Sequence, residues 1–343
     1  MKDNFEISVI ISTYNRCHIL GEALDSVLSE QEGNARYEVI VVDNNSVDDT
    51  RQVVASFIAR GHHNLRYLLE CRQGVSYARN AGIAAAKAPI LAFFDDDVCV
   101  ARNWLSGIKR ALEEHPEVDF VGGKVLPRWE TPPPPWLTRA HWAPLALVDF
   151  GEEPLYVNSR NPLCLVTANL AIRRAAIVEV GLFAPELQRV RDGIGSMEDS
   201  ELLIRLWRHG RQGLYLPDLT VVTRVPDERL TKDYHRRWHT GHGYFYALAH
   251  FEEIERTTAG WLYGAPAHLY KQAMLDAAGW LRCMATGKWD DAFRYETRLR
   301  FFSGFFRQRR REATRRQSAV REAFMIIRSA LTGKAATDAS RKL

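Results

Sequence analysis

The chain has 343 residues, of which 46% are hydrophobic and 26% charged, and a formal net charge of +4. This length can bury a sizeable core and suggests one large domain with an appendage, while the small net charge does not imply nucleic acid as a partner. Five widely spaced cysteines without a Cys-x-x-Cys pair argue against a zinc site or a disulfide framework and fit a reducing compartment. Polar residues 1–6 and the lack of an apolar run near the ~20 residues of a spanning helix predict a cytoplasmic protein.

Apolar runs of strand length alternate with helical patterns over the first hundred residues. Strands are predicted at 7–12, 37–42, 65–70 and from 88 to the acidic residues 95–97, with helices at 19–28, 48–60 and 76–86. This alternation predicts a mostly parallel sheet with helices on both faces, where ligands bind outside the carboxyl ends of the strands. Polar residues follow three of the strands, at 13–16, 43–45 and 95–97, so we expect them to meet at one edge of the sheet.

Asp95, Asp96 and Asp97 are three adjacent carboxylates at the end of a buried strand. A divalent cation would relieve their mutual repulsion, since hard oxygen ligands suit Mg²⁺ or Mn²⁺ together with substrate phosphates. A helix N-terminus, where Asp is favoured as a cap, is the alternative. The convergence of the other two polar strand ends favours the cation site.

The region after this triplet is less regular. Helices are predicted at 103–115, 173–180 and 201–209, strands at 118–125, 163–172, 213–216 and 219–225, and a flexible glycine loop in 191–200. Prolines at 132–135 exclude regular structure there. The tryptophans around them, Trp129, Trp136 and Trp142, favour a loop that covers the site and stacks on a sugar, with a stiff connector as the alternative.

Five sequence runs closely resemble family 2 glycosyltransferases of the GT-A fold. They are Ser-Val-Ile-Ile-Ser-Thr-Tyr-Asn-Arg (8–16), Glu-Val-Ile-Val-Val-Asp-Asn-Asn-Ser (38–46), Gln-Gly-Val-Ser-Tyr-Ala-Arg-Asn-Ala-Gly (73–82), Phe-Asp-Asp-Asp (94–97) and Met-Glu-Asp-Ser-Glu-Leu (197–202). The resemblance implies a GT-A-type, Rossmann-like α/β domain with a mostly parallel central sheet flanked by helices. It also implies an inverting transfer of a sugar from a nucleotide diphosphate sugar that depends on Mg²⁺ or Mn²⁺.

By this resemblance, Thr13, Tyr14 and Asn15 lie against the nucleoside of the donor, and Asp43 accepts a hydrogen bond from its base. An aromatic face stacks well on a base, and a carboxylate can accept a ring N–H. An ordinary loop tyrosine is the alternative for Tyr14, and a helix or turn cap is the alternative for Asp43.

The resemblance places Arg79 and Asn80 along the donor, where a guanidinium can pair with a diphosphate. A structural ion pair of Arg79 with acidic residues at the strand ends is the alternative. The resemblance assigns Asp95 and Asp97 to the metal, with Asp97 reaching it most directly, and lets Asp96 contact the ribose or a metal-bound water.

The family's acidic pair is matched by Glu198 and Asp199. Inversion by a single displacement needs a general base for the acceptor hydroxyl, and we assign Asp199 to that role, with Glu198 holding the loop. A solvated cap at a helix N-terminus is the alternative for both. Many members of the family carry a histidine shortly after the last strand of the core. This sequence has Arg224 there instead, which could neutralise the diphosphate directly.

Three regions are predicted, a catalytic nucleotide-sugar-binding domain at 1–225, a helical acceptor-side and membrane-proximal region at 226–332, and a disordered tail at 333–343. Gly241 and Gly243 are expected to interrupt the first helix of the second region. Segment 289–311 mixes aromatic residues with arginines, which fits an element lying on an anionic membrane surface, at the inner face of the membrane. Packing of these aromatic residues onto the catalytic domain is the alternative.

The predicted function is metal-dependent, inverting transfer of a sugar to a hydroxyl of a saccharide, a lipid-linked saccharide or a small molecule. Transfer to a polyprenyl phosphate is an enzymatic alternative that needs no strong base, because the acceptor is a phosphate. A non-catalytic sugar-nucleotide-binding protein is a further alternative. Nucleic acid is not expected as a partner, and the oligomeric state is left open.

Overall fold

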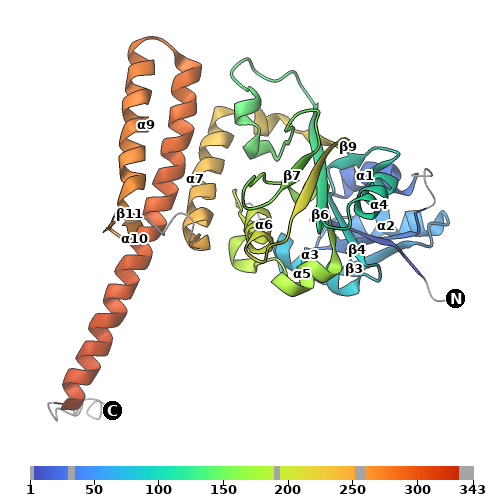
Figure 1. Cartoon of the computed structure of the whole chain (residues 1–343), viewed down its shortest axis with the longest axis horizontal. Helices are drawn as coiled ribbons and strands as arrows, with labels where there is room; N and C mark the ends of the chain where they lie inside the picture. The colour runs from blue at the N-terminus through green and yellow to red at the C-terminus, as the bar shows by residue number, and fades with distance from the viewer. Residues whose placement is uncertain (1–3, 30–34, 189–193, 252–259, 332–343) are drawn as a thin grey trace. The chain divides into compact units, whose positions relative to one another are not determined.

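The computed structural model describes residues 4–29, 35–188, 194–251 and 260–331. The chain divides into two compact units, Met1–Trp238 and His239–Leu343. Within the described residues, the first unit contains one nine-stranded sheet with helices on both sides, and the second unit is mainly helical (Figure 1). The predicted glycine loop lies partly, and the predicted tail wholly, outside the described residues.

The first four strands form the predicted parallel part of the sheet, in the order β3-β2-β1-β4. These strands are β1 (Ile7–Thr13), β2 (Tyr37–Asp43), β3 (Leu65–Leu69) and β4 (Ile90–Asp95), and the helices between them are α1 (Cys17–Leu28), α2 (Thr50–Ala59) and α3 (Val75–Ala85). In the register, Thr13 pairs with Asp43, and Ser12 pairs with Asp95. The polar strand ends therefore meet at one edge of the sheet, as the sequence predicts.

The other half of the sheet is mixed. Strand β8 (Leu170–Arg173) runs antiparallel to both β4 and β6 (Phe120–Trp129), and β9 (Gly213–Val225) runs parallel to β6. Two short strands, β5 (Val98–Val100) and β7 (Leu155–Val157), pair with β9 in the antiparallel sense. The sheet is thus parallel from β3 to β4 and mixed beyond β4.

Two strand predictions in this half are wrong in extent. The segments 213–216 and 219–225 form the single strand β9, and the strand predicted at 163–172 is shortened by a 3₁₀ turn, η3 (Thr167–Asn169). Within this turn, the amide of Asn169 donates to the carbonyl oxygens of Lys124 and Leu219 at 3.0 and 2.7 Å. The turn thereby satisfies two buried carbonyls of β6 and β9, which an apolar strand residue would leave without these bonds.

Helices cover both faces of the sheet, with α1, α2 and α4 (Trp104–Glu114) on one side and α3, α5 (Arg174–Val180) and α6 (Glu198–Arg208) on the other (Figure 1). Strand β4, which leads into the acidic triplet, is buried from both sides. Phe93 and Phe94 are each 1% exposed, and their rings lie 5.7 Å from Phe183 and 5.6 Å from Trp104, respectively. This two-sided burial explains why the sequence of β4 is a continuous apolar run.

The second unit contains most of α7 (Lys232–Ala249), the hairpin of β10 (Trp261–Leu262) and β11 (Ala265–Pro266), and the helices α9 (Ala267–Ala285) and α10 (Trp289–Leu331). The predicted interruption at Gly241 and Gly243 is wrong, because α7 is continuous through both. A Cβ on Gly243 would lie 2.0 Å from the carbonyl oxygen of Phe301. Glycine thus lets α7 and α10 approach closely, and this packing offsets the ~1 kcal/mol by which glycine disfavours a helix.

The aromatic residues of α10 mostly pack within the second unit. Phe302 and Phe305 are buried, and the ring of Phe306 stacks on that of Tyr270 with 4.0 Å between the centroids. Trp289 is exposed. Among the described helices, none is long and apolar enough to cross a membrane. The aromatic composition of 289–311 is therefore explained by contacts between helices, and it no longer favours a membrane surface.

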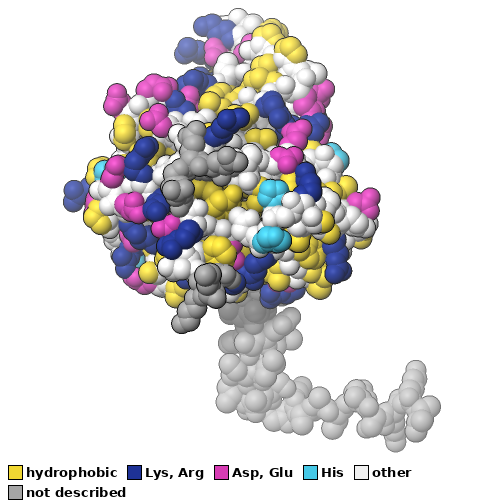
Figure 2. Space-filling model, turned by 90° about the vertical axis from the view of Figure 1, so that its right-hand side faces the viewer, with side chains coloured by type: hydrophobic (Ala, Val, Ile, Leu, Met, Phe, Trp, Pro, Cys, Tyr) yellow, Lys and Arg dark blue, Asp and Glu magenta, His cyan; other side chains and the backbone are white. Residues whose placement is uncertain are grey.

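Basic and acidic side chains are interspersed on the face of the molecule shown in Figure 2, with hydrophobic side chains between them. The chain has 46 Lys and Arg against 42 Asp and Glu, and on this face the excess does not gather into a continuous basic surface. Nucleic-acid binding depends on such a surface, so this face does not favour it.

Candidate active site

The loops that follow β1 and β2 are joined by hydrogen bonds at the polar edge of the sheet. The Asn15 N–H donates to the Ser46 hydroxyl at 2.9 Å, and the Asn15 amide oxygen accepts the Val47 N–H at 2.8 Å. Asn15 has φ +52°, in the left-handed region that Asn tolerates better than most residues. The side chain of Asn15 thus joins the two loops. The neighbouring Tyr14 is 37% exposed, and its ring is accessible to solvent.

Asp43 lies at the end of β2 and is buried. Its Oδ1 accepts the Ser46 N–H at 2.8 Å, and its Oδ2 accepts the Tyr67 hydroxyl at 2.7 Å. Burial, with a smaller effect from this hydrogen bond, raises the pKa of Tyr67 to about 12. The turn cap considered for Asp43 is therefore present, and its contact with a nucleoside stays a prediction, as does that of the buried Thr13 beside it.

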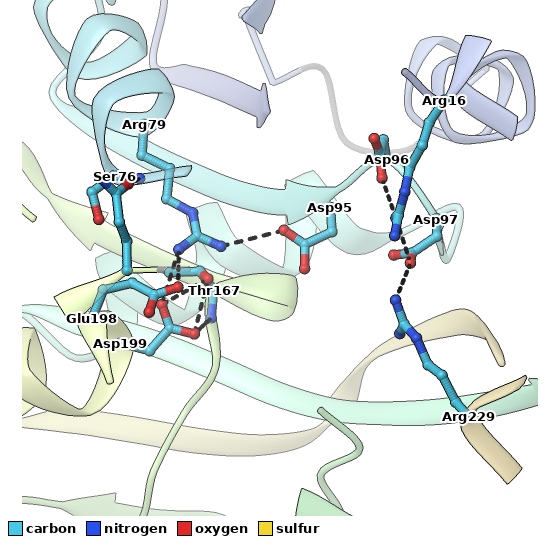
Figure 3. A network of polar contacts seen from close by, with 11 residues as sticks. Arg16, Ser76, Arg79, Asp95, Asp96, Asp97, Thr167, Glu198, Asp199 and Arg229 are labelled. Carbon is cyan, nitrogen blue, oxygen red and sulfur yellow. Dashed lines mark hydrogen bonds and ion pairs between the residues drawn. The ribbon is translucent and has the colours of Figure 1, made fainter. Parts of the chain in front are cut away.

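Two arginine side chains form ion pairs with the carboxylates of the acidic triplet (Figure 3). Nη1 of Arg16 lies 2.8 Å from Asp96 Oδ1 and 2.9 Å from Asp97 Oδ2, and Nη2 of Arg229 lies 3.8 Å from the same Asp97 oxygen. Burial raises the pKa of Asp96 to about 6, and the nearby Asp97 and Asp95 add to this, while Arg16 opposes it. Part of the repulsion within the triplet is thus relieved by arginines of the chain itself.

Arg79 of α3 connects the triplet to the acidic pair of α6, as Figure 3 shows. Its guanidinium is buried, with Nη2 at 3.4 Å from Asp95 Oδ1 and Nη1 at 3.2 Å from both Glu198 Oε1 and Asp199 Oδ1. The ion pair considered as the alternative for Arg79 is therefore present in the structure. The two acidic groups, which are a hundred residues apart in sequence, form one network around this side chain.

Asp199 is held from its other side by Thr167. The Thr167 hydroxyl lies 2.9 and 3.0 Å from the two carboxylate oxygens, and the Thr167 N–H donates to Oδ2 at 3.2 Å. Burial raises the pKa of Asp199, and the neighbouring Glu198 adds to this, while Arg79 and the Thr167 hydrogen bonds lower it. The side chain of Glu198 is only 6% exposed, so it is not a solvated cap.

Two predicted donor residues have protein partners. The side-chain amide of Asn80 donates to the Phe183 carbonyl at 2.9 Å and accepts the Phe183 N–H at 3.0 Å, which fixes α3 to the loop after α5. The guanidinium of Arg224 pairs with Glu130, while its backbone N–H donates to the Asp97 carbonyl at 2.9 Å. Both donor contacts stay predictions, and these partners give each side chain a structural role.

The proline segment is irregular, as predicted, but its tryptophans are half-buried against the core. The ring of Trp136 lies 5.1 Å from that of His235 and 5.5 Å from that of His141, both in edge-to-face contacts. Such packing leaves less ring surface for a sugar, so the predicted stacking role stays a prediction.

Sequence reasoning assigned no individual role to three residues that the structure brings to the network, Arg16, Thr167 and Arg229. Arg16 ends the first of the five quoted runs, and its charge next to a polar strand end was a usable signal. Thr167 lies inside an apolar run that was interpreted as a strand, and Arg229 follows the last strand in η5 (Asp227–Leu230). Their proximity to the carboxylates arises from long-range packing and has no local pattern.

The oxygen atoms of these carboxylates are suitable ligands for a divalent cation. Among the described residues, the contacts in Figure 3 join five carboxylates, of Asp95, Asp96, Asp97, Glu198 and Asp199, to three guanidinium groups, and these eight groups together carry two more negative than positive charges when all are ionised. Among the residues that the structure describes, no ready-made group of three His, Cys, Asp or Glu ligands is found. Mg²⁺ and related ions often use one or two carboxylates plus substrate phosphates, so Asp95 and Asp97 fit that kind of site.

Comparisons with known proteins indicate the family of this chain. A model described as Glycosyl transferase family 2 matches residues 8–181. Glycosyltransferase AglE of Haloferax volcanii is 39% identical over 121 residues, which cover 35% of this chain and 39% of AglE. Validoxylamine A glucosyltransferase of Streptomyces hygroscopicus subsp. jinggangensis is 28% identical over 228 residues, which cover 60% of this chain and 52% of that protein. The chain thus spans about half or less of the length of these curated relatives.

Among solved structures, the mannosyltransferase PcManGT of Pyrobaculum calidifontis, in complex with GDP-Man and Mn²⁺, is similar with a TM-score of 0.56 at 20% identity, over 88% of each chain. This similarity confirms the GT-A-type fold. The family model covers about half of the chain and contains the strand ends and the triplet, whereas the acidic pair of α6 lies beyond it. The chain belongs to glycosyl transferase family 2.

Proposed function

We propose that this protein is a metal-dependent, inverting glycosyltransferase that moves a sugar from a nucleotide diphosphate sugar to a hydroxyl group of an acceptor. The observation that carries the proposal is the position of Arg79, whose guanidinium lies within 3.4 Å of Asp95, Glu198 and Asp199. It supports a single reaction site formed by the triplet and the acidic pair. Both curated relatives described above are named as transferases of sugars, which supports the same reaction class.

The donor is assigned to the polar edge of the sheet. The exposed ring of Tyr14 is suited to stack on the base, and the buried Thr13 and Asp43 border the same edge. The guanidinium groups of Arg16 and Arg229 lie on the triplet and suit a diphosphate, which guanidinium binds in a bidentate manner. Arg229 is proposed here in addition to Arg224, which the sequence suggested for the diphosphate and whose side chain pairs with Glu130.

Asp95 and Asp97 would hold Mg²⁺ or Mn²⁺ at the donor diphosphate. When bound, such a cation supplies Lewis-acid stabilisation of the charge that develops on the departing nucleoside diphosphate. The excess negative charge of the network supports this assignment, as does the presence of Mn²⁺ with GDP-Man in the PcManGT structure. Asp96, held by Arg16, keeps the turn between Asp95 and Asp97 in place.

Asp199 would act as the general base. In a single displacement, the acceptor oxygen forms the new bond to the anomeric carbon as the bond to the diphosphate breaks, and the hydroxyl proton passes to the Asp199 carboxylate. Burial raises the pKa of this carboxyl and makes it a stronger base, while Arg79 helps to keep it ionised. Glu198, bonded to the same arginine, fixes the start of α6.

The acceptor is proposed to present a hydroxyl group, on a saccharide, a lipid-linked saccharide or a small molecule. A polyprenyl phosphate already carries a negative oxygen and needs no base, so the buried and hydrogen-bonded Asp199 favours a hydroxyl. The relative that is named for glucosylation of validoxylamine A supports a small-molecule acceptor.

A screen of nucleotide diphosphate sugars, read as release of the nucleoside diphosphate, tests the proposal. Turnover is expected with Mn²⁺ or Mg²⁺ and is expected to stop when a chelator is added. Asp97→Asn should lower turnover about 100-fold, since it removes one of the two carboxylates proposed to hold the cation. The matched variant Asp25→Asn changes a side chain that is 67% exposed on α1 and should have no effect.

Turnover that is insensitive to the chelator would contradict the metal role. A protein that binds nucleotide sugars and releases no nucleoside diphosphate from any of them would support the non-catalytic alternative instead.

A further inference from the structure

We infer that Thr167 is a positioning residue for the general base, which it holds in one orientation through its hydroxyl and its backbone N–H. The inference rests on the proposed function, in which Asp199 takes the acceptor proton. Thr167 would not touch the substrate, because it is 1% exposed.

The contacts of Asp199 leave it little freedom. Oδ1 lies 2.9 Å from the Thr167 hydroxyl and 3.2 Å from Nη1 of Arg79, and Oδ2 lies 3.0 Å from that hydroxyl and 3.2 Å from the Thr167 N–H. The side chain nevertheless keeps 21% of its surface exposed. A carboxylate offers about four lone-pair sites, so these contacts leave room for one further proton donor at the exposed edge.

The position of Thr167 is fixed by the turn in which it lies. Two residues later, the Asn169 side chain donates to Lys124 and Leu219 in the sheet, and its oxygen accepts the indole N–H of Trp104 at 2.8 Å. The turn η3 is therefore held by β6, β9 and α4. Through Thr167, the carboxylate of Asp199 is oriented by the sheet that also carries the triplet.

Two physical effects follow from these hydrogen bonds. They hold the carboxylate in a single orientation. The rate of proton transfer falls steeply when a base is displaced from its productive position. They also stabilise the ionised form of Asp199 and so oppose the effect of burial. Loss of the hydroxyl should therefore slow the chemical step and shift the titration of the base towards higher pH.

The test compares Thr167→Val, which keeps the shape and removes the hydroxyl, with Thr167→Ser, which keeps the hydroxyl. For the Val variant, kcat at pH 7 should fall about tenfold, and the acidic limb of the kcat profile should move up by about one pH unit, with little change in KM for the donor. The Ser variant should restore most of both. Thr220→Val is the matched control, since its hydroxyl bonds the Pro217 carbonyl on β9 and should leave the profile unchanged.

A Val variant that is less stable but keeps the wild-type kcat and acidic limb would overturn the inference, because the hydroxyl would then be structural only. A Ser variant as impaired as the Val variant would also overturn it. A wild-type protein that turns over no donor contradicts the proposed function itself, and so is distinguishable from a failure of the Thr167 role.

Discussion

Asp199 is the residue on which the proposed chemistry most directly depends. Asp199→Asn keeps the size of the side chain but cannot accept a proton, so kcat should fall about 100- to 10,000-fold. Donor affinity should change little, because Arg16 and Arg229, which are proposed for the diphosphate, lie on Asp96 and Asp97 and away from Asp199. Rate assays with the identified donor, together with calorimetric titration of that donor, measure the two quantities separately.

Glu201→Gln is the control for this change. Glu201 lies in the same first turn of α6 and pairs with Arg205, away from Arg79. Near-normal turnover of Asp199→Asn would show that another group takes the proton, or that the acceptor is a phosphate.

At the residue scale, the sequence indicated which acidic side chains to examine better than it indicated the side chains that they contact. The acidic triplet and the acidic pair were both singled out. Arg79 had two open interpretations: its three carboxylate contacts show that the ion-pair network is present, while its contact with the donor stays a prediction. Thr167 could not be found, since a threonine within an apolar run fits a strand as well as a turn. Its contact with Asp199 spans 32 residues of sequence and depends on how η3 and α6 pack.

At the scale of elements, the close approach of α7 and α10 leads to a stability prediction. A Cβ on Gly304 would lie 2.0 Å from the Thr240 carbonyl oxygen, so Gly304→Ala should destabilise the second unit by about 1–3 kcal/mol through overpacking. Thermal unfolding followed by calorimetry should show a lower midpoint. The donor affinity should be unchanged, since every predicted site residue precedes residue 239.

Gly21→Ala is the matched helix variant. Gly21 lies in α1, and a Cβ there would meet no atom within 4 Å. Alanine should therefore raise stability by up to about 1 kcal/mol. Equal effects of the two substitutions would mean that helix propensity, and not the contact between helices, explains Gly304.

The parallel half of the sheet was predictable because each strand and its helix are local patterns that repeat. The mixed half was not, because β8 inserts between β4 and β6 although it follows both in sequence. A short apolar strand has the same pattern in either direction, so only its long-range partners decide whether it runs parallel or antiparallel.

For the whole molecule, a buried histidine predicts the response to acid. His235 is fully buried, and burial, with a smaller effect of the nearby His141, lowers its pKa to about 4. The folded pKa is below the value of about 6.5 expected when unfolded. Its contribution to stability is therefore present above pH 6.5 and is lost as the pH falls through about 4, by about 3 kcal/mol in all.

Denaturant unfolding between pH 7 and pH 4 measures this loss. In His235→Phe, which keeps an aromatic ring beside Trp136, the loss should be smaller by that amount. The half-buried His115, whose side chain is 36% exposed, is the control, and His115→Phe should lose stability with acid as the wild type does. An identical pH dependence of the wild type and His235→Phe would show that His235 does not control acid sensitivity.

The acidic triplet also lies where the backbone passes from the middle of the sheet to its far edge. Asp95 ends β4 in the middle of the sheet, and Val98 begins β5, which pairs with β9 at the far edge. Within this crossing, the carbonyl oxygen of Asp97 accepts the Arg224 N–H at 2.9 Å. Any movement of the Asp97 peptide when its carboxylate changes partner must alter this bond. The rate at which the Arg224 amide exchanges with deuterium would therefore report whether a ligand is bound at the triplet. This reporter lies on β9, a strand that carries none of the triplet's carboxylates.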